Sequence, residues 1–227
     1  ANASEKRVLS LLQEQLADDD LIVVGQRVTD HEKDHEIDFV VAIEGAGIVC
    51  VEVKGGEVWH TGTEWRQNAR GRVKTIHPVR QVRQARYALR AFVESDPRWT
   101  QRRPRWNHVV VLTNSELPQD FALADCPNWM AIDRNGLDDL GERLRHISLT
   151  QKVDLPLLSP TAMAQLRAAL GGRGLPQRDV VARALENEHA ADILTEQQAV
   201  VLSAIRLLNR VEIRGGAGSG KTFLAVE

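Results

Sequence analysis

Apolar residues recur at the spacing of an amphipathic helix in three parts of the chain. Within residues 3–17, Val8, Leu12 and Leu16 share one face, and charged residues occupy the opposite face. Residues 78–94 show the same pattern and begin at Pro78, a residue that the first helical position tolerates. A third helix is predicted over residues 137–147.

Short runs rich in β-branched residues predict strands between these helices. They lie at residues 21–24, 37–43, 48–53 and 109–112. Residues 29–36 contain no apolar residue and are predicted as a loop, whereas the Gly-containing segment 44–47 is predicted as a hairpin turn. The resulting order, α-β-β-β-α-β-α, favours the α/β class: an α/β/α sandwich around one mixed central sheet.

The spacing of prolines and glycines changes after residue 150. Short helical stretches interrupted by these residues predict a helical connector over 151–192, following a first domain of residues 1–150. A helix at 196–208 and a strand at 211–214 then lead into a Gly-rich turn. Residues 193–227 are therefore expected to begin a second domain.

Composition narrows the class of protein. Of the 227 residues, 43% are hydrophobic, which is enough for a core and excludes wholesale disorder. Uncharged apolar runs are far shorter than the ~18 residues of a membrane span, and no leader peptide is recognisable. Cys50 and Cys126 match no metal-binding or redox spacing. We expect a cytoplasmic protein that does not enter a membrane.

The net charge of −2 hides a strong asymmetry along the chain. Residues 1–57 carry 13 Asp and Glu against 5 Lys and Arg, whereas residues 66–106 carry 12 Lys and Arg against 2 Asp and Glu. An acidic cluster followed by a basic segment suits a metal-dependent enzyme that acts on a polyanion. The alternative is a solvated helix face rich in arginine.

The acidic cluster includes the predicted hairpin. A turn centred on Gly45 places Asp38 directly opposite Glu52, and Lys54 shares a face with Glu52. Two neighbouring carboxylates repel unless a cation compensates them, and all-oxygen ligands favour Mg²⁺ or Mn²⁺. Lys54 could then polarise an attacking water. The alternative is that Lys54 only neutralises the two carboxylates.

A complete G-x-x-x-x-G-K-[ST] motif follows the last predicted strand. Its backbone N–H groups would surround a β-phosphate, its lysine would reach the β- and γ-oxygens, and its threonine would contact Mg²⁺. The predicted ATP-binding residues are Gly215, Gly216, Ala217, Gly218, Ser219, Gly220, Lys221 and Thr222. Because no Walker B acid follows, we expect a fragment that binds ATP without hydrolysing it.

Residues 194–198, Leu-Thr-Glu-Gln-Gln, resemble the adenine-recognising Gln motif of superfamily 1 helicases. This resemblance implies that Gln198 contacts the adenine edge of ATP. The alternative is a surface glutamine near the start of a helix.

The hairpin strands resemble the PD-(D/E)xK nucleases, and in particular their nuclease-related domain (NERD) branch. The resemblance lies in Glu-Ile-Asp-Phe-Val-Val at 36–41 and Val-Glu-Val-Lys-Gly-Gly at 51–56. Ser4-Glu5-x-x-Val8 resembles the first-helix Glu motif of that branch, and His-Pro-Val-Arg-Gln at 77–81 its Asn-Pro-x-x-Gln motif. The resemblance implies a restriction-endonuclease-like fold over about residues 3–150. NERD domains are often joined to superfamily 1 helicase cores, in agreement with the motif at 215–222.

The same resemblance assigns roles to the hairpin residues. Asp38 and Glu52 would be metal ligands, the Val53 carbonyl would be a third ligand, and Lys54 would be the catalytic lysine. Two helix residues complete this set.

Glu5 would bind a second metal or orient its water, and Gln81 would support Lys54 or a phosphate. Without the resemblance, both would be interpreted as solvated helix residues.

The basic segment contains arginines at helical spacing, which suit phosphate contacts along one helix face. The predicted nucleic-acid contacts are Arg80, Arg83, Arg86 and Arg90.

Together these features predict an Mg²⁺- or Mn²⁺-dependent nuclease acting on nucleic acid, with DNA as the favoured substrate, joined to the start of a helicase-type ATPase. The competing hypothesis is a non-catalytic nucleic-acid-binding module that loads a superfamily 1 helicase through the same basic face.

Overall fold

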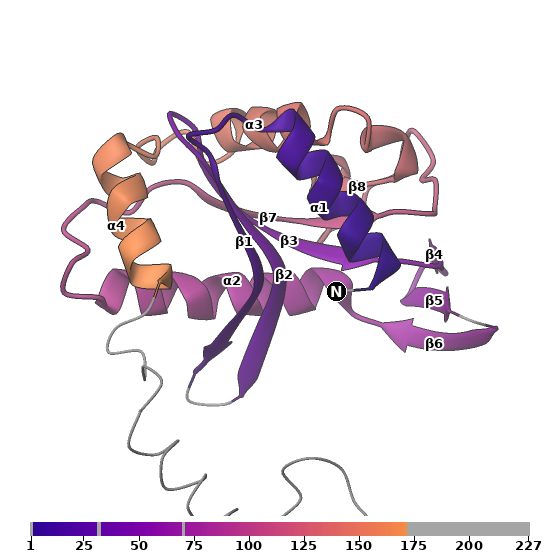
Figure 1. Ribbon diagram of the computed structural model, residues 1–227. Coiled ribbons are helices and arrows are strands. Elements are labelled where there is room, and N and C mark those ends of the chain that lie inside the picture. Colours follow the sequence, from indigo (N-terminus) through magenta and orange to yellow (C-terminus); the bar gives the residue numbers. More distant parts are fainter. Residues whose placement is uncertain (1, 31–32, 70, 172–227) are drawn as a thin grey trace, which may run out of the picture. The chain divides into compact units, whose positions relative to one another are not determined.

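The computed structural model describes residues 2–30, 33–69 and 71–171. A central sheet and a smaller sheet form within this part of the chain, together with four α-helices and two short 3₁₀-helices, η1 (Asn128–Met130) and η2 (Arg134–Gly136) (Figure 1). The α-helices are α1 (Ala3–Gln15), α2 (Pro78–Ser95), α3 (Leu140–Thr150) and α4 (Pro160–Leu170).

The central sheet is mixed, as the sequence predicts. Its strands are β1 (Leu21–Thr29), β2 (Asp34–Ile43), β3 (Gly47–Lys54), β7 (Trp106–Leu112) and β8 (Ala131–Ile132), in that spatial order. β1, β2 and β3 pair antiparallel, whereas β3 with β7 and β7 with β8 pair parallel.

The predicted hairpin register is confirmed. The β2–β3 ladder runs from Ile43–Gly47 to Phe39–Val51, which is the register of a turn centred on Gly45. Gly45 has a φ of 70°, a left-handed conformation that glycine adopts without strain. In this register Asp38 and Glu52 are the next residues beyond the end of the ladder.

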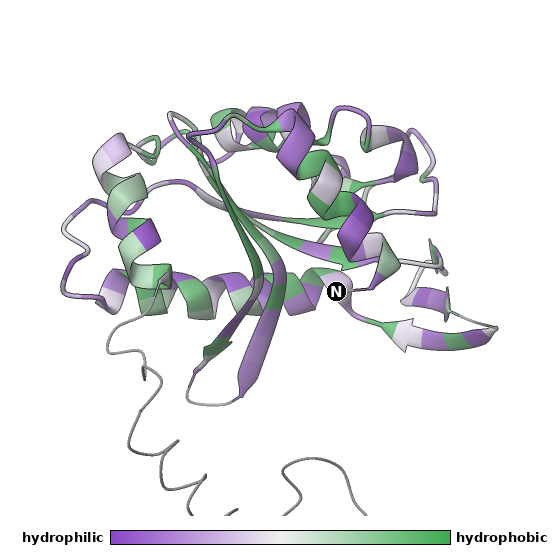
Figure 2. Cartoon of the chain, viewed as in Figure 1, coloured by the Kyte–Doolittle hydropathy of each residue, from purple (hydrophilic) through white to green (hydrophobic). Residues whose placement is uncertain are grey.

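Helices cover both faces of the central sheet (Figure 1). α1 and α3 pack on the face that carries Phe39, Val49 and Val51, and α2 and α4 belong to the core on the other face. Figure 2 shows the hydrophobic residues concentrated along the sheet between these helices. The expected sandwich architecture is therefore present in the described residues.

The smaller sheet was not predicted from the sequence. It contains β4 (Glu57–His60), β5 (Trp65–Ala69) and β6 (Arg72–Ile76), paired antiparallel in that order. These strands are short and mostly polar, and only Val58, Trp65 and Ile76 join the main core. Gly62 and Gly71, which flank β5 in the sequence and both have positive φ, are the signals that could have indicated turns on either side of it.

Residues 29–36 are not a single loop, so that prediction is wrong. β1 continues to Thr29 and β2 begins at Asp34, and the two residues pair across the hairpin. The Thr29 hydroxyl donates a hydrogen bond of 2.6 Å to Asp34. Cross-strand pairing and side-chain hydrogen bonds hold these polar residues in strands that local hydrophobicity does not reveal.

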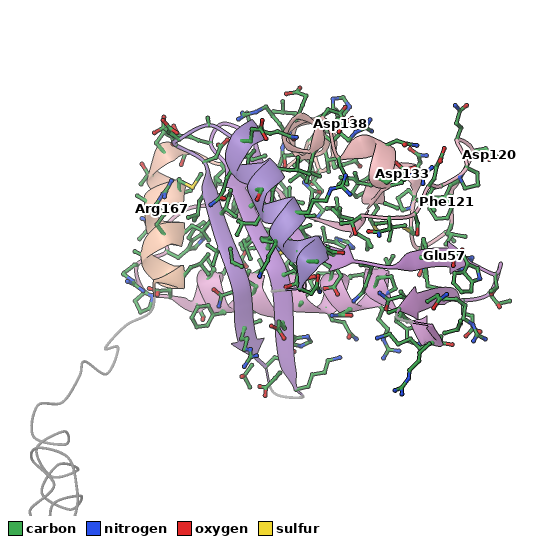
Figure 3. All side chains as sticks on the ribbon, turned by 45° about the vertical axis from the view of Figure 1, so that its right-hand side comes forward. Glu57, Asp120, Phe121, Asp133, Asp138 and Arg167 are labelled. Atoms are coloured by element: carbon green, nitrogen blue, oxygen red, sulfur yellow. The ribbon has the colours of Figure 1, made fainter. Side chains whose placement is uncertain are left out.

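The segment after residue 150 differs in part from the expected connector. α4 begins at Pro160 and buries Ala162, Met163 and Leu166 in the same core as α2. Arg167 of α4, labelled in Figure 3, donates to the carbonyl oxygen of Asp19 at 2.7 Å. Contacts along the chain group residues 1–173 into one compact unit, which therefore extends beyond the expected boundary at residue 150.

Several sequence-based predictions lie outside the described residues. These are the motif at 215–222, Gln198, and the predicted helix and strand that precede the motif. Within the described ranges, no helix combines the length and the apolar character that crossing a membrane requires.

Candidate active site

Asp38 lies where β2 and β3 stop pairing through their backbones. Its Oδ2 accepts a hydrogen bond of 2.7 Å from the backbone N–H of Val53, the position at which a ladder bond would otherwise form. Burial raises the pKa of Asp38, while the Val53 hydrogen bond opposes that shift. β3 therefore fixes this half-buried carboxylate at the edge of the site.

Glu52 is almost fully enclosed, with 1% of its surface exposed. Its Oε1 is 2.5 Å from the Lys54 ammonium, and its Oε2 is buried without a hydrogen-bond partner among the described residues. Burial raises the pKa of Glu52 to about 7; the charge of Lys54 opposes this shift and that of Asp38 adds to it. Glu52 is thus a carboxylate whose charge is only partly compensated within the protein.

Lys54 connects the carboxylates to α2. Its ammonium donates to Glu52 and, at 3.3 Å, to Oε1 of Gln81 in the first turns of that helix. An ammonium has three donors, so one N–H remains for a group outside these two contacts. The structure thus brings Gln81 to Lys54, the position that the sequence resemblance implies.

Glu5 approaches the same region from α1. As the third residue of that helix it forms a capping box with Asn2, whose backbone N–H donates to Glu5 at 3.1 Å. The charge of Glu5 contributes to raising the pKa of Asp38. Gly55 permits this approach, because a Cβ at Gly55 would collide with the Ser4 hydroxyl.

The oxygen atoms of Asp38 and Glu52 are of the type that binds a hard divalent cation, but two side chains alone do not complete its coordination. Among the described residues, no three His, Cys, Asp or Glu side chains are grouped so that they could hold a metal ion. Asp38 and the unpartnered Oε2 of Glu52 nevertheless offer oxygen ligands of the type that Mg²⁺ and Mn²⁺ prefer. Alternate residues of a strand face opposite neighbours, so the Val53 carbonyl lies on the β2 side, with Asp38.

The predicted arginine stripe is divided between surface and core. Arg80 is exposed and Arg83 half-buried, whereas Arg86 is 3% exposed and donates to the Trp106 carbonyl at 3.1 Å. The Arg90 guanidinium lies 5.1 Å from the centre of the Tyr87 ring. Arg86 lies four residues after Val82 and three before Leu89, so it shares the buried face of α2, whereas Arg80 lies on the exposed face.

An open pocket of about 400 Å³ borders Lys54 and Gln81. Its charged lining residues are all cationic: Lys33, Lys54, Lys74 and Arg80. Lys33 is not among the site residues predicted from the sequence, and it reaches the pocket from the far end of the β1–β2 hairpin. No local sequence signal marks that approach, because it depends on the length of both strands.

The comparisons with known proteins point to one family. No curated protein and no solved structure is significantly similar to the chain. The family model of the nuclease-related domain, NERD, matches residues 1–113. By this match, the N-terminal segment is nuclease-related, and it contains the five residues of the candidate active site: Glu5, Asp38, Glu52, Lys54 and Gln81.

Proposed function

We propose that this chain is an Mg²⁺- or Mn²⁺-dependent nuclease that hydrolyses phosphodiester bonds of nucleic acid, with DNA as the favoured substrate. The observation that carries the proposal is that Asp38, held by the Val53 N–H, lies close enough to Glu52 to raise its pKa, while Lys54 contacts both Glu52 and Gln81. This arrangement joins two carboxylates, a lysine and an open cationic pocket within the segment that matches the nuclease-related family.

Asp38, Glu52 and the Val53 carbonyl would hold the cation, and Glu5 would add charge or orient water at its edge. The bound cation would supply positive charge to the phosphate during hydrolysis. The raised pKa of Glu52 supports this assignment, because burial and the charge of Asp38 both disfavour the ionised form of Glu52 when no cation is bound. A divalent cation would favour the ionised form of both carboxylates.

Lys54 would act on the phosphate directly. In hydrolysis, a water oxygen bonds to phosphorus, the bond from phosphorus to one ester oxygen breaks, and that oxygen leaves with a proton. The remaining N–H of Lys54 would donate to a phosphate oxygen, where negative charge increases during the reaction. Glu52 and Gln81 would keep the ammonium in place for that contact.

The competing proposal is a nucleic-acid-binding module without catalysis, which the cationic pocket would serve equally well. Plasmid and oligonucleotide cleavage separates the two in the presence of Mg²⁺, Mn²⁺ or EDTA. We expect cation-dependent cleavage by the wild type and at least about 10²-fold slower cleavage by Asp38→Asn and Lys54→Met. Cleavage unaffected by either substitution, or no cleavage with retained DNA binding, would reject the nuclease proposal.

A second part of the proposal concerns residues 215–222 and Gln198 and rests on the sequence motif alone. We propose that this segment binds ATP and is the beginning of a helicase-type ATPase. Lys221 would contact the β- and γ-phosphates. Lys221→Ala should abolish ATP binding measured by calorimetry while leaving metal-dependent DNA cleavage unchanged.

A further inference from the structure

Besides Lys54 of β3, three separate parts of the chain line the cationic pocket. The β1–β2 hairpin contributes Lys33, β6 contributes Lys74, and the first turns of α2 contribute Arg80, Gln81 and Gln84. Lys54 borders this pocket and contacts Glu52, the neighbour of Asp38. Lys54 therefore joins the pocket to the candidate active site, since Asp38 and Glu52 do not line the pocket themselves.

Lys54 pairs with Glu52, but the positive charge of the other three cations of this pocket is not neutralised by the described residues. Lys33 donates to the neutral Gln84 side chain at 2.7 Å, and Lys74 and Arg80 are exposed. None of these three cations forms an ion pair within the described ranges.

Other arginines of the same basic region behave differently. Arg66 pairs with Glu64, Arg98 with Asp96 at 2.6 Å, and Arg103 with Glu94. Ion pairing therefore neutralises part of the basic segment, but not Lys33, Lys74 and Arg80, which converge on one pocket.

The first turn of α2 adds positive electrostatic potential to the same pocket. Its first internal hydrogen bond is donated by Gln81 to the His77 carbonyl, so the N–H groups of Val79 and Arg80 precede the first helical bond. His77, at the N-cap, makes no side-chain capping bond. A helix of this length has partial positive charge at its first turn, which favours a bound anion.

We infer that this pocket binds a backbone phosphate of the nucleic acid next to the phosphate that is cleaved. The inference rests on the proposed function for the identity of the ligand. A phosphate fits because it accepts hydrogen bonds from several cations at once, and nucleic acid presents phosphates in sequence along a strand. Lys33, Lys74 and Arg80 would hold the flanking phosphate, which leaves the phosphate beyond Lys54 facing Asp38 and Glu52.

The test measures binding without catalysis. A fluorescein-labelled DNA oligonucleotide is titrated with the full chain in EDTA, without ATP, over a series of salt concentrations. We expect Lys74→Ala/Arg80→Ala to raise the Kd about tenfold and to lower the slope of log K against log salt by about 1 to 2. The charge-retaining Lys74→Arg/Arg80→Lys variant should stay close to the wild type in slope.

The matched control is Lys6→Ala/Arg102→Ala, which removes two exposed charges outside the pocket. It should change the Kd less than about twofold. Equal losses in the control and the pocket variant, or an unchanged Kd and slope in the pocket variant, would overturn the inference. Circular dichroism melting of each variant verifies folding before the titration.

A separate cleavage assay in Mn²⁺ distinguishes this inference from the proposed function. Pocket-dependent binding without any cleavage by the wild type would support the phosphate site and reject the nuclease. Cleavage by the wild type with pocket-independent binding would support the nuclease and reject the phosphate site.

Discussion

Glu52 is the most deeply buried carboxylate of the candidate site. It is 1% exposed, and among the described residues one of its oxygens has no hydrogen-bond partner and Lys54 is its one cationic contact. Such a carboxylate is costly in a protein that has only to fold. We interpret this cost as a consequence of a site built for a divalent cation.

This environment predicts a particular pH dependence of stability. The pKa of Glu52 is raised from 4.5 to about 7, so the unfolded chain releases the proton at lower pH than the folded protein does. Stability is therefore lost as the pH rises between these values. In EDTA, the free energy of unfolding of the wild type should fall relative to that of Glu52→Gln from about pH 4.5 to about pH 7.

Urea denaturation across this pH range measures the difference between the unfolding free energies of the wild type and Glu52→Gln. The slope of that difference against pH should not exceed ~1.4 kcal/mol per pH unit, the value for one proton. A difference that is independent of pH would contradict the assignment of a raised Glu52 pKa.

Substitution of Gln81 should slow DNA cleavage less than substitution of Lys54, and it should act mainly on kcat. Gln81→Met removes the 3.3 Å contact to Lys54 but keeps the size of the side chain, and Glu52 still holds the ammonium. We expect kcat for DNA cleavage to fall about tenfold, with a smaller change in KM. Gln13→Met, on the exposed face of α1, is the control and should leave both values unchanged. Equal effects of the two substitutions would remove Gln81 from the positioning of Lys54.

At the scale of elements, the junction between β3 and β4 determines how the small sheet meets the site. Gly56 has a φ of 73°, and a Cβ there would collide with the Asn68 carbonyl in β5. Gly62 has a φ of 96°, but a Cβ would meet nothing within 4 Å. An alanine at Gly62 would therefore suffer backbone strain alone, whereas an alanine at Gly56 would suffer both backbone strain and a steric collision.

Gly62→Ala should lower the free energy of unfolding by about 1 kcal/mol, through backbone strain alone. Gly56→Ala should lower it by more than about 2 kcal/mol, because β5 must also move. Chemical denaturation compares the two variants. A Gly56→Ala variant no less stable than Gly62→Ala would contradict the close packing of β5 against this junction.

The elements also show which parts of the site could be predicted from sequence. The β2–β3 register followed from alternation and one glycine, because a hairpin turn fixes every pair that follows it. The small sheet was missed because β6 exposes four of its five residues and therefore shows little hydrophobic pattern. Arg86 matched the arginine spacing yet lies in the core, because it also continues the apolar positions of Val82 and Leu89 on the buried face of α2.

For the whole molecule, the candidate site and the cationic pocket both lie within one compact unit of residues 1–173. α4 completes the core of this unit by packing Leu166 and its neighbours beneath α2. Lys33 reaches the pocket only because two long strands carry it there, so the sequence could not reveal its position. The nuclease-related match ends at residue 113, but the structure extends the folded unit well beyond it.

This organisation predicts that residues 1–173 fold and act alone. A protein ending at Arg173 should unfold cooperatively and cleave DNA in Mn²⁺ at a rate close to that of the full chain. ATP should not change that rate, because the motif at 215–222 is absent. Calorimetric melting and a cleavage time course test both points, and an unfolded or inactive fragment beside an active full chain would contradict them.

The proposed function depends on Asp38 and Glu52 holding the divalent cation that the reaction requires. The most direct measurement is anomalous X-ray scattering from crystals of the protein soaked in Mn²⁺, compared with crystals of Asp38→Asn treated identically. We expect an anomalous peak between the Asp38 and Glu52 carboxylates in the wild type that is lost in the variant. A protein that cleaves DNA in Mn²⁺ yet shows its peak elsewhere, or an unchanged peak in Asp38→Asn, would show that these two carboxylates do not hold the catalytic cation.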